Sequence, residues 1–284
     1  MSVRTALAIA GSDSGGGAGI QADLKAFARC GVHGTTAITA ITAQNTAGVS
    51  AIHAVPPEVI LAQVRAVLSD IGVDAVKVGM LGTAPTARAV ARALGELPAA
   101  TPVVVDPVMV AESGAELLDA DARRVLVEEI LPRATVLTPN LHEARALAGG
   151  AAPAERSHGA GGGDDEQAEA EQLTRAVLAM GPRCVVLTGG HRARTVDLFL
   201  DADADGAGRI VAIDGQRHPD GAAHGSGCTH SSVLAAQLAL GRSRLQAART
   251  ARALAGAAIA RGLRELGAGA GPVDVLDLER MRSA

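Results

Sequence analysis

The sequence has almost no aromatic residues: it contains no tryptophan, no tyrosine, and only Phe27 and Phe199. Proteins that bind single-stranded nucleic acid stack successive bases on aromatic side chains, and this chain lacks the residues for such a platform. Its formal net charge of −4 gives no general attraction to phosphate backbones or to anionic membranes. The composition therefore predicts neither nucleic acid nor a membrane as a partner.

Lysine is also scarce, because Lys25 and Lys77 are the only lysines among 26 cationic residues. No Gly-Lys-Ser or Gly-Lys-Thr occurs, which excludes a P-loop nucleotide site. The three cysteines, Cys30, Cys184 and Cys228, are odd in number and far apart, so neither a disulfide framework nor a zinc ribbon is predicted.

Long hydrophobic runs are missing as well. No apolar stretch approaches the roughly 20 residues that a membrane-spanning helix needs. The apolar run near the start of the chain is too short to resemble the hydrophobic core of a secretory signal peptide. Because 48% of the residues are hydrophobic, the chain can still build a large core. We expect a soluble, cytoplasmic protein.

Short β-branched runs alternate with amphipathic stretches along the 284 residues, a pattern typical of a parallel sheet covered by helices. We expect one α/β domain over residues 1–284, with the Gly- and Ala-rich segment 149–165 as a flexible surface insertion. The pattern predicts strands at Thr5–Ala10, Thr35–Thr42, Ala75–Val78, Pro102–Val105, Thr135–Leu137 and Cys184–Leu187, and a hairpin of Thr195–Leu200 with Arg209–Asp214. It predicts helices at Ile20–Arg29, Pro57–Ile71, Ala84–Leu97, Asp121–Leu131, Leu141–Ala148, Glu166–Met180, Gly227–Leu240 and Arg244–Leu266.

A glycine-rich loop, Ala10–Asp23, follows the first predicted strand. Its Gly17-x-Gly19-x-x-Ala22 segment permits a dinucleotide fingerprint, but that fingerprint needs an acidic residue about 20 positions later. Residues 24–57 contain no Asp or Glu, which disfavours a nicotinamide site. Ser14 also lies in a loop that mimics a serine-protease nucleophile, but no histidine precedes it and the chain is not all-β. A flexible turn remains possible, although so many glycines favour a backbone wall close to a small substrate.

A second glycine motif, Gly225-Ser226-Gly227-Cys228, runs directly into a predicted helix. Backbone N–H groups and the positive end of the helix dipole converge at such a turn, which suits the phosphoryl group that a phosphotransferase moves. The same field is expected to lower the pKa of the Cys228 thiol and to make it a base or an activator. The alternative is a tight turn with a buried cysteine near a helix cap.

Polar side chains follow two of the predicted strands. Asp106 ends the strand Pro102–Val105, and Asn140 and Glu143 stand at a helix start after Thr135–Leu137. Mg²⁺ prefers a few protein oxygens together with water and phosphates, so these groups beside an anion site predict magnesium-phosphate chemistry. Each could instead cap a helix, Asn140 above all. Their joint occurrence favours the metal site.

Several motifs occur in a fixed order over nearly the whole chain: Ala10–Lys25, Thr42–Thr46, Lys77–Leu81, Asp106–Met109, Thr138–Glu143 and His224–Thr229. The set resembles the hydroxymethylpyrimidine/phosphomethylpyrimidine kinases of thiamine biosynthesis, in the ribokinase-like superfamily. The resemblance implies a kinase that uses ATP and Mg²⁺ to phosphorylate 4-amino-5-hydroxymethyl-2-methylpyrimidine and then its monophosphate. It also implies a lid-less three-layer sandwich, with a mostly parallel central sheet and helices on both faces, and a homodimer.

The resemblance implies a role for each matching position. The Gln44 side chain would hydrogen-bond the polar edge of the pyrimidine, and Cys228 stands where sugar kinases of the superfamily carry an aspartate base. Positions matching the pyrimidine cradle are Gly11, Ala18, Gln44, Met80 and Val108. Positions matching the anion hole are Gly225, Ser226, Gly227 and Cys228; those matching the Mg²⁺-phosphate site are Asp106 and Glu143; and those on the nucleotide side are Asn140, Thr188 and Gly190.

One position departs from the family pattern. Members commonly carry lysine before the glycine pair, where this chain has Thr188-Gly189-Gly190. Thr188 can only hydrogen-bond the nucleotide, so the missing cation must come from His191, Arg192 or Mg²⁺, or the rate is lower. Lid-less pyridoxal kinases also carry threonine here, which keeps pyridoxal kinase as the alternative. A dinucleotide-dependent oxidoreductase and a non-catalytic metabolite-binding protein stay open from other classes.

Overall fold

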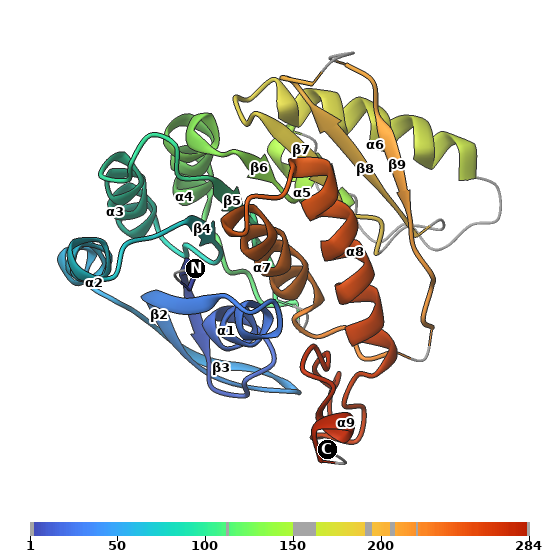
Figure 1. Cartoon of the computed structure of the whole chain (residues 1–284), viewed down its shortest axis with the longest axis horizontal. Helices are drawn as coiled ribbons and strands as arrows, with labels where there is room; N and C mark the ends of the chain where they lie inside the picture. The colour runs from blue at the N-terminus through green and yellow to red at the C-terminus, as the bar shows by residue number, and fades with distance from the viewer. Residues whose placement is uncertain are drawn as a thin grey trace.

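The computed structural model describes residues 3–111, 114–149, 163–190, 195–204, 208–219 and 221–282. They form a nine-stranded sheet flanked by helices, with strand order β3-β2-β1-β4-β5-β6-β7-β8-β9 (Figure 1). The strands are β1 (Thr5–Asp13), β2 (His33–Asn45), β3 (Gly48–Ala54), β4 (Ala75–Val78), β5 (Val103–Val105), β6 (Val136–Leu137), β7 (Cys184–Leu187), β8 (Val196–Asp201) and β9 (Val211–Asp214). The helices are α1 (Gly19–Arg29), α2 (Pro57–Asp70), α3 (Ala84–Gly95), α4 (Ala120–Val125), η1 (Leu126–Ile130), η2 (Leu131–Arg133), α5 (Leu141–Leu147), α6 (Gly163–Leu178), α7 (Ser226–Ala239), α8 (Arg244–Ala260) and α9 (Leu278–Arg282).

The centre of the sheet is parallel, as the sequence predicted. Strand β1 pairs in parallel with β2 and β4, and the parallel pairing continues through β5, β6 and β7. Strands β3, β8 and β9 are added antiparallel at the two edges. The carboxyl ends of the parallel strands therefore meet at one edge of the sheet, which is where open α/β sheets bind ligands.

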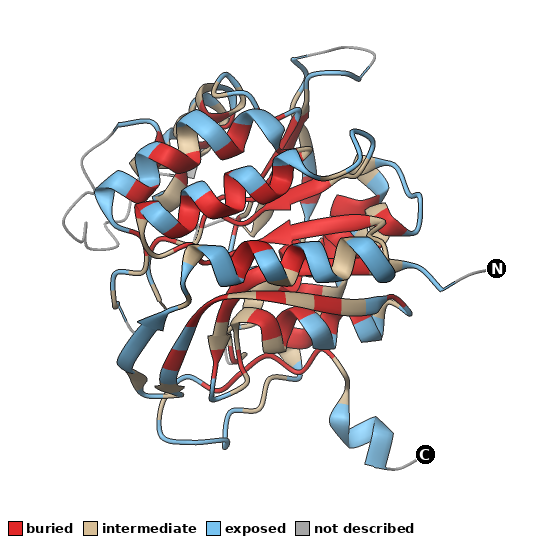
Figure 2. Ribbon diagram, turned by 90° about the vertical axis from the view of Figure 1, so that its left-hand side faces the viewer, coloured by how far each residue is buried: buried red, intermediate tan, exposed pale blue. Residues whose placement is uncertain are grey.

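Helices cover both faces of the sheet, and the alternation of side chains in β1 shows how. Leu7 and Ile9 belong to the core packed against α2, α3 and α4 on one face. Ala6 and Ala8 point to the other face, where they share a core with α1, α7 and α8. Figure 2 shows buried residues concentrated in the strands and on the helix surfaces turned toward them. The predicted three-layer architecture is confirmed.

Three elements differ most from the prediction, and one of them, the short helix α9, lies in a segment for which no helix was predicted. Strand β3 was missed, because its residues are largely exposed and show no alternating apolar pattern. Helix α8 ends at Ala260 instead of continuing to Leu266. A Cβ at Gly262 would overlap Ala222, and the N–H of Leu263 donates to the carbonyl of Pro272 at 2.8 Å, so the chain turns away there.

Of the expected insertion at 149–165, residues 150–162 lie outside the described residues. Its last residues do not form a loop, because α6 already begins at Gly163. Across the described parts of the chain, no helix is both long and apolar enough to cross a membrane.

A buried lysine joins the sheet to the helices on one face. Lys77 in β4 is fully buried, and its Nζ lies 2.9 Å from Asp23 Oδ1 in α1 and 3.9 Å from Asp106 Oδ2 after β5. Two serines of α7 complete this ion cluster: Ser232 Oγ donates to Asp23 at 2.6 Å and Ser231 Oγ to Asp106 at 2.9 Å. Burial by itself lowers the pKa of Lys77, but the negative charges beside it, Asp23 above all, raise it above its ordinary value. Lys77 therefore stays charged.

Replacing Lys77 by methionine should destabilise the protein by about 3–5 kcal/mol, because it leaves two buried carboxylates without their counter-charge. Equilibrium unfolding in urea measures this difference. The double variant Lys77→Met/Asp23→Asn removes one of the uncompensated charges and should recover part of the lost stability. A Lys77→Met protein as stable as the wild type would contradict the central role of the ion cluster.

Candidate active site

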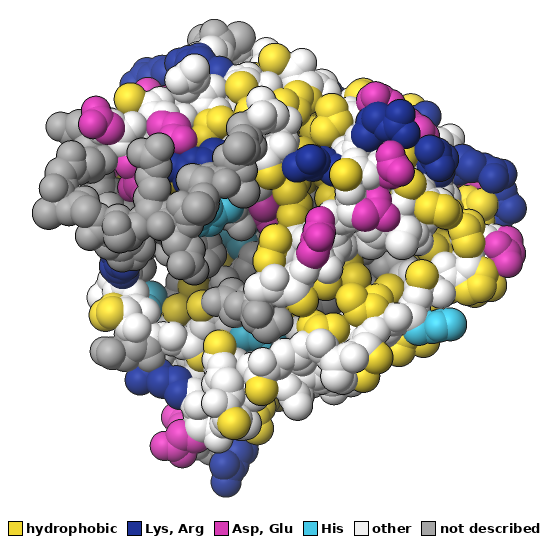
Figure 3. All heavy atoms as spheres, turned by 180° about the vertical axis from the view of Figure 1, so that it is seen from behind, with side chains coloured by type: hydrophobic (Ala, Val, Ile, Leu, Met, Phe, Trp, Pro, Cys, Tyr) yellow, Lys and Arg dark blue, Asp and Glu magenta, His cyan; other side chains and the backbone are white. Residues whose placement is uncertain are grey.

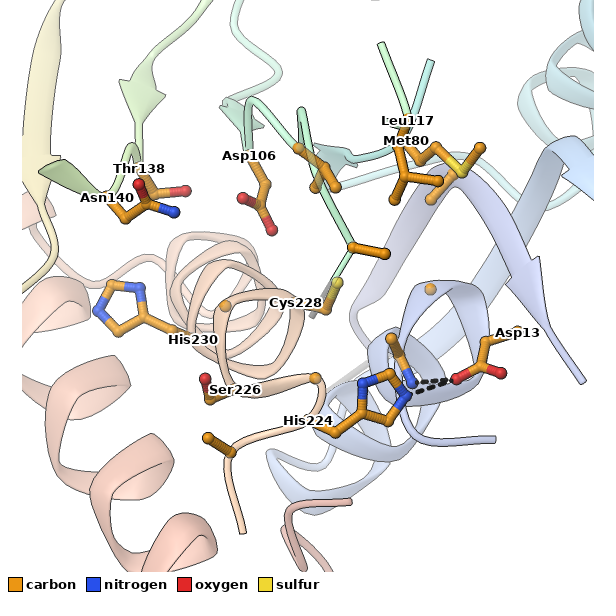
Figure 4. A pocket seen from close by; sticks show the side chains of 18 of the residues that line it. Asp13, Met80, Asp106, Leu117, Thr138, Asn140, His224, Ser226, Cys228 and His230 are labelled. Carbon is orange, nitrogen blue, oxygen red and sulfur yellow. Dashed lines mark hydrogen bonds and ion pairs between the residues drawn. The ribbon is translucent and has the colours of Figure 1, made fainter. Parts of the chain in front are cut away.

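One pocket opens where β1, β4, β5 and β6 end, and the N-terminal turn of α7 forms its opposite wall (Figure 4). It brings together segments from both ends of the chain and from the middle. Every residue that the sequence singled out for the site lines it, namely Gly11, Ala18, Gln44, Met80, Asp106, Val108, Asn140, Glu143, Thr188, Gly190, Gly225, Ser226, Gly227 and Cys228. The roles of these residues stay predictions.

Asp13 organises the glycine-rich loop, a function that the sequence analysis did not assign to it. Its carboxylate accepts hydrogen bonds from the backbone N–H groups of Gly15, Gly17 and Ala18 at 2.8–3.0 Å, and it lies 3.0 Å from His224 Nε2. Burial by itself raises the pKa of Asp13, but His224 and the backbone donors lower it below its ordinary value. The loop lines the pocket as predicted, yet these three amides are held by Asp13 and are not directed at a ligand.

A local signal could have indicated part of this arrangement. An aspartate with glycine two residues later is typical of a turn in which the side chain binds the following backbone. The contact between Asp13 and His224 gave no such signal, because the two residues are 211 positions apart.

The two glycine motifs touch through their backbones. Helix α7 begins at Ser226, directly after Gly225, whose φ of +79° lies in the left-handed region. A Cβ at Gly225 would overlap the carbonyl oxygen of Gly17. The amides of Gly227 and Cys228 belong to the first turn of α7, where a helix has no intrahelical acceptors for its N–H groups. This turn therefore presents backbone donors and the positive end of the helix dipole to the pocket.

The expectation of a low pKa for Cys228 is wrong. Burial raises the pKa of its thiol to about 12; the charge of Lys77 lowers it, but the carboxylates of Asp106 and Asp23 raise it. Desolvation and nearby negative charge outweigh the helix dipole at this position. At neutral pH Cys228 is a protonated thiol.

Asn140 and Glu143 form a capping box at the start of α5. The Glu143 N–H donates to Asn140 Oδ1 and the Asn140 N–H donates to Glu143 Oε2, both at 2.9 Å. Sequence alone left a cap and a ligand site as alternatives, and the structure shows the cap in two residues that also line the pocket. Burial, and then the negative charge of Asp106, raise the pKa of Glu143 to about 8.

Thr188 and Gly190 follow β7 on the far side of Asn140. The N–H of Thr188 donates to the carbonyl of Pro139 at 2.8 Å, which holds the two segments side by side. His191 and Arg192, the side chains expected to replace the missing lysine, lie outside the described residues.

Three further polar residues of the pocket wall were not predicted from the sequence. Asp197 comes from β8, His230 from α7 and Arg252 from α8, and all three line the pocket. No motif marks them, because they meet only through the pairing of β7 with β8 and the packing of α7 on α8.

Comparison with known proteins agrees with this geometry. The family model described as phosphomethylpyrimidine kinase matches residues 13–274. A hydroxymethylpyrimidine/phosphomethylpyrimidine kinase of Rhizobium meliloti (strain 1021) is 45% identical over 271 residues, which cover 94% of this chain and 95% of that protein.

Solved structures agree as well. The pyridoxal kinase from Staphylococcus aureus in complex with ADP superposes with a TM-score of 0.82 at 31% identity, covering 99% of this chain and 96% of that one. The phosphomethylpyrimidine kinase from Clostridium difficile 630 gives a TM-score of 0.70 at 34% identity, covering 88% and 96%.

A three-layer α/β fold with a glycine turn at a helix N-terminus, facing carboxylates at strand ends, defines a small-molecule phosphotransferase. Within that class, the chain belongs to the phosphomethylpyrimidine kinase family. The family resemblance that the motifs indicated is thereby confirmed.

The contact between the two glycine motifs predicts a difference between neighbouring variants. Gly225→Ala should destabilise the protein by more than about 1 kcal/mol, because an L-residue is strained at this φ and its Cβ would overlap Gly17. Gly227→Ala is the matched control, since its methyl group would meet no atom within 4 Å. We expect its stability in urea unfolding to equal or exceed that of the wild type. Equal losses in both variants would contradict the close backbone contact.

Proposed function

We propose that this protein is a kinase of thiamine biosynthesis, which uses ATP and Mg²⁺ to phosphorylate 4-amino-5-hydroxymethyl-2-methylpyrimidine and then its monophosphate. The observation that carries the proposal is a single pocket that joins a phosphate-binding helix turn, two carboxylates and the planar amide of Gln44. The relative from R. meliloti is named for both phosphorylations, and the S. aureus neighbour binds ADP.

The pyrimidine is proposed to lie between β1, β2 and β4. Gln44 Oε1 accepts a hydrogen bond from Thr42 Oγ1 at 3.2 Å, which orients the amide. An amide can donate and accept at once, as the edge of an aminopyrimidine requires. Met80 is buried against Gly11, where an added Cβ would come within 2.9 Å of its sulfur. Met80, Gly11, Ala18 and Val108 would then supply the apolar contacts of the ring.

Asp106 and Glu143 fit a magnesium ion. Within the described residues, no group of three or more His, Cys, Asp or Glu side chains could hold a metal, and Mg²⁺ suits a site with few carboxylates because it keeps water and phosphate oxygens as ligands. The raised pKa of Glu143, caused by burial and by the charge of Asp106, indicates that a cation would be favourable beside both groups. When bound, Mg²⁺ neutralises charge on the phosphate oxygens.

Cys228 is proposed to accept the proton of the substrate hydroxyl. In the transfer, the hydroxyl oxygen bonds to the γ-phosphorus, the bond from that phosphorus to the bridging oxygen of ADP breaks, and the hydroxyl proton must leave. With a pKa of about 12, Cys228 must first release its own proton to water in the pocket, and the charge of Lys77 favours that release. In a loose transition state the hydroxyl proton leaves late, so the base acts only after most of the bond to ADP is broken.

Pyridoxal kinase is the second candidate, favoured by Thr188 and by the likeness to the S. aureus enzyme. A coupled ATP-consumption assay with the pyrimidine, its monophosphate and pyridoxal in parallel separates the two. We expect turnover of the first two compounds, with a kcat/KM for pyridoxal at least about tenfold lower. A higher kcat/KM for pyridoxal would overturn the proposal. If none of the three compounds caused ATP consumption, the result would favour a dinucleotide-dependent oxidoreductase or a non-catalytic metabolite-binding protein instead.

We also propose a homodimer in the cytoplasm. Ile41 in β2 and Ile52 in β3 are 52% and 47% exposed near the sheet edge, an apolar pair that a second copy would cover. On the face drawn in Figure 3, Lys and Arg side chains are interspersed with Asp and Glu, which fits a protein without nucleic-acid partners. In sedimentation equilibrium, Ile52→Lys should shift the wild-type dimer toward monomer, and a monomeric wild type would contradict the proposal.

Removing the thiol should slow the chemical step. We expect Cys228→Ala and Cys228→Ser to lower kcat by about 10²–10⁴-fold, the usual contribution of a general base. The dissociation constant for ADP, measured by calorimetry, serves as the control and should change little. Near-full kcat in Cys228→Ala would rule out the base role.

Glu143→Gln separates the metal role from the cap, because glutamine can also occupy this position of a capping box. The variant should need about tenfold more Mg²⁺ for half-maximal activity and should have a lower kcat, with an unfolding temperature near pH 7 at least as high as that of the wild type.

The pH dependence of stability has a defined sign. The folded pKa of Glu143, about 8, lies above its ordinary value of 4.5, so ionisation of Glu143 removes stability as pH rises between the two values. Above pH 8 without Mg²⁺, Glu143→Gln should therefore be at least as stable as the wild type. If the variant instead unfolds and its residual activity shows normal Mg²⁺ dependence, Glu143 serves only as the cap.

A further inference from the structure

A second charged cluster lies behind the nucleotide side of the pocket, away from Lys77. Asp197 is fully buried, and its Oδ1 accepts a hydrogen bond from the Gly189 N–H at 2.8 Å. Arg252 Nη1 lies 3.5 Å from the same oxygen, and His230 Nε2 lies 3.4 Å from Asp197 Oδ2. Arg252 also donates from Nη2 to the carbonyl of Thr195 at 2.6 Å. The hydrogen bond from the Gly189 N–H attaches the cluster to the turn Thr188–Gly190.

The cluster contains buried polar atoms for which the protein supplies no hydrogen-bond partner. Only 4% of the surface of His230 is exposed, and among the described residues neither of its ring nitrogens has a hydrogen-bond partner; Asp197 Oδ2 and Arg252 Nε also lack one. Nε2 still lies 3.4 Å from Asp197 Oδ2, so Nδ1 is the nitrogen left for a ligand. Buried side-chain nitrogens in native proteins are nearly always hydrogen-bonded, so an unpaired one that lines a pocket indicates a ligand. Figure 4 shows the ring on the side of α7 where Thr138 and Asn140 lie.

The position of His230 on α7 also places it close to the first turn of that helix, where the phosphates are proposed to bind. His230 follows Ser226 by four residues, so the two side chains occupy the same face of the helix, one turn apart. The cations Lys77 and Arg252 of the pocket wall already have partners, because Lys77 pairs with Asp23 and Arg252 lies 3.5 Å from Asp197. A phosphate chain that leaves the first turn of α7 toward Asn140 therefore meets the His230 ring.

The charges in the cluster are arranged for an anion. Burial by itself raises the pKa of Asp197, but the contact with His230, the charge of Arg252 and the Gly189 N–H lower it, so the carboxylate is ionised. The carboxylate faces Nε2 of the imidazole at 3.4 Å. Arg252 offsets its negative charge, so Asp197 orients the ring without repelling a phosphate. A phosphate on the other side would place the imidazole between two anions, with one ring nitrogen toward each.

We propose that His230, oriented by Asp197 and Arg252, binds the phosphate chain of the nucleotide through a hydrogen bond donated by Nδ1. It supplies a hydrogen-bond donor next to the turn in which Thr188 replaces the lysine common in the family. The inference rests on the proposed function only in taking a nucleoside triphosphate as the phosphate donor. It does not depend on which hydroxymethyl compound is phosphorylated.

Calorimetric binding of ADP and of adenosine tests this contact without catalysis. His230→Leu should weaken ADP binding by about tenfold or more, since a charge-assisted hydrogen bond is lost, and should leave adenosine binding unchanged. His230→Asn keeps a donor close to the position of Nδ1 but no charge, and should lie between the wild type and His230→Leu. His53→Leu, which removes an exposed histidine of β3, is the control and should bind ADP normally.

A lysine introduced at position 188, in the neighbouring turn, gives a second test. Thr188→Lys should recover most of the ADP affinity in the His230→Leu background and add less to the wild type, because both side chains would serve the same phosphates. Three results would overturn the proposal: unchanged ADP affinity in His230→Leu, an equal loss for adenosine, or the same gain from Thr188→Lys in both backgrounds. If His230→Leu does not fold, His230→Asn decides by the same comparison. A failure of the pyrimidine assay alone would leave these results untouched.

Discussion

The ammonium group of Lys77 lies where α1, β4, α7 and the end of β5 meet, and its charge determines how these elements can pack. Asp23 of α1 and Asp106 after β5 both lie within 4 Å of it, and Ser232 and Ser231 bind the same two carboxylates from α7. Removing three charges from water is favourable only when all the partners are in place. The cluster therefore fixes the first turns of α7 against the strand ends, and with them the distance across the pocket.

Small residues permit the close packing that this cluster requires. The small side chains of Ala6 and Ala8 in β1 allow α1 and α7 to lie close to the sheet. The backbones of Gly17 and Gly225 are in direct contact. A larger side chain on either surface would separate the glycine-rich loop from α7 and would open the ion cluster to water. The scarcity of aromatic residues in the sequence agrees with such a core, in which helices lie close to the sheet.

Periodicity and local motifs were enough to predict the parallel strands, their covering helices and the family, because these features are encoded within short segments. The exposed strand β3 was missed because it has no buried face, and α8 was predicted too long because its end is set by Gly262 against Ala222. The predicted residues that line the pocket are those that a motif surrounds. His230 was not predicted, and the pKa of Cys228 was predicted in the wrong direction, because burial and the carboxylates near it depend on distant segments.

The charges of the pocket explain why nucleotide and metal should bind together. Asp13 lies beside His224, Asp23 pairs with Lys77 and Asp197 lies beside Arg252, so these carboxylates are already engaged within the protein and do not attract a metal. Glu143 has no such partner among the described residues, and its raised pKa shows the resulting cost of ionising it. A polyphosphate alone would add negative charge beside Asp106, and Mg²⁺ alone would have to displace a proton from Glu143. Bound together, each compensates the other, so the affinity for either should rise when the other is present.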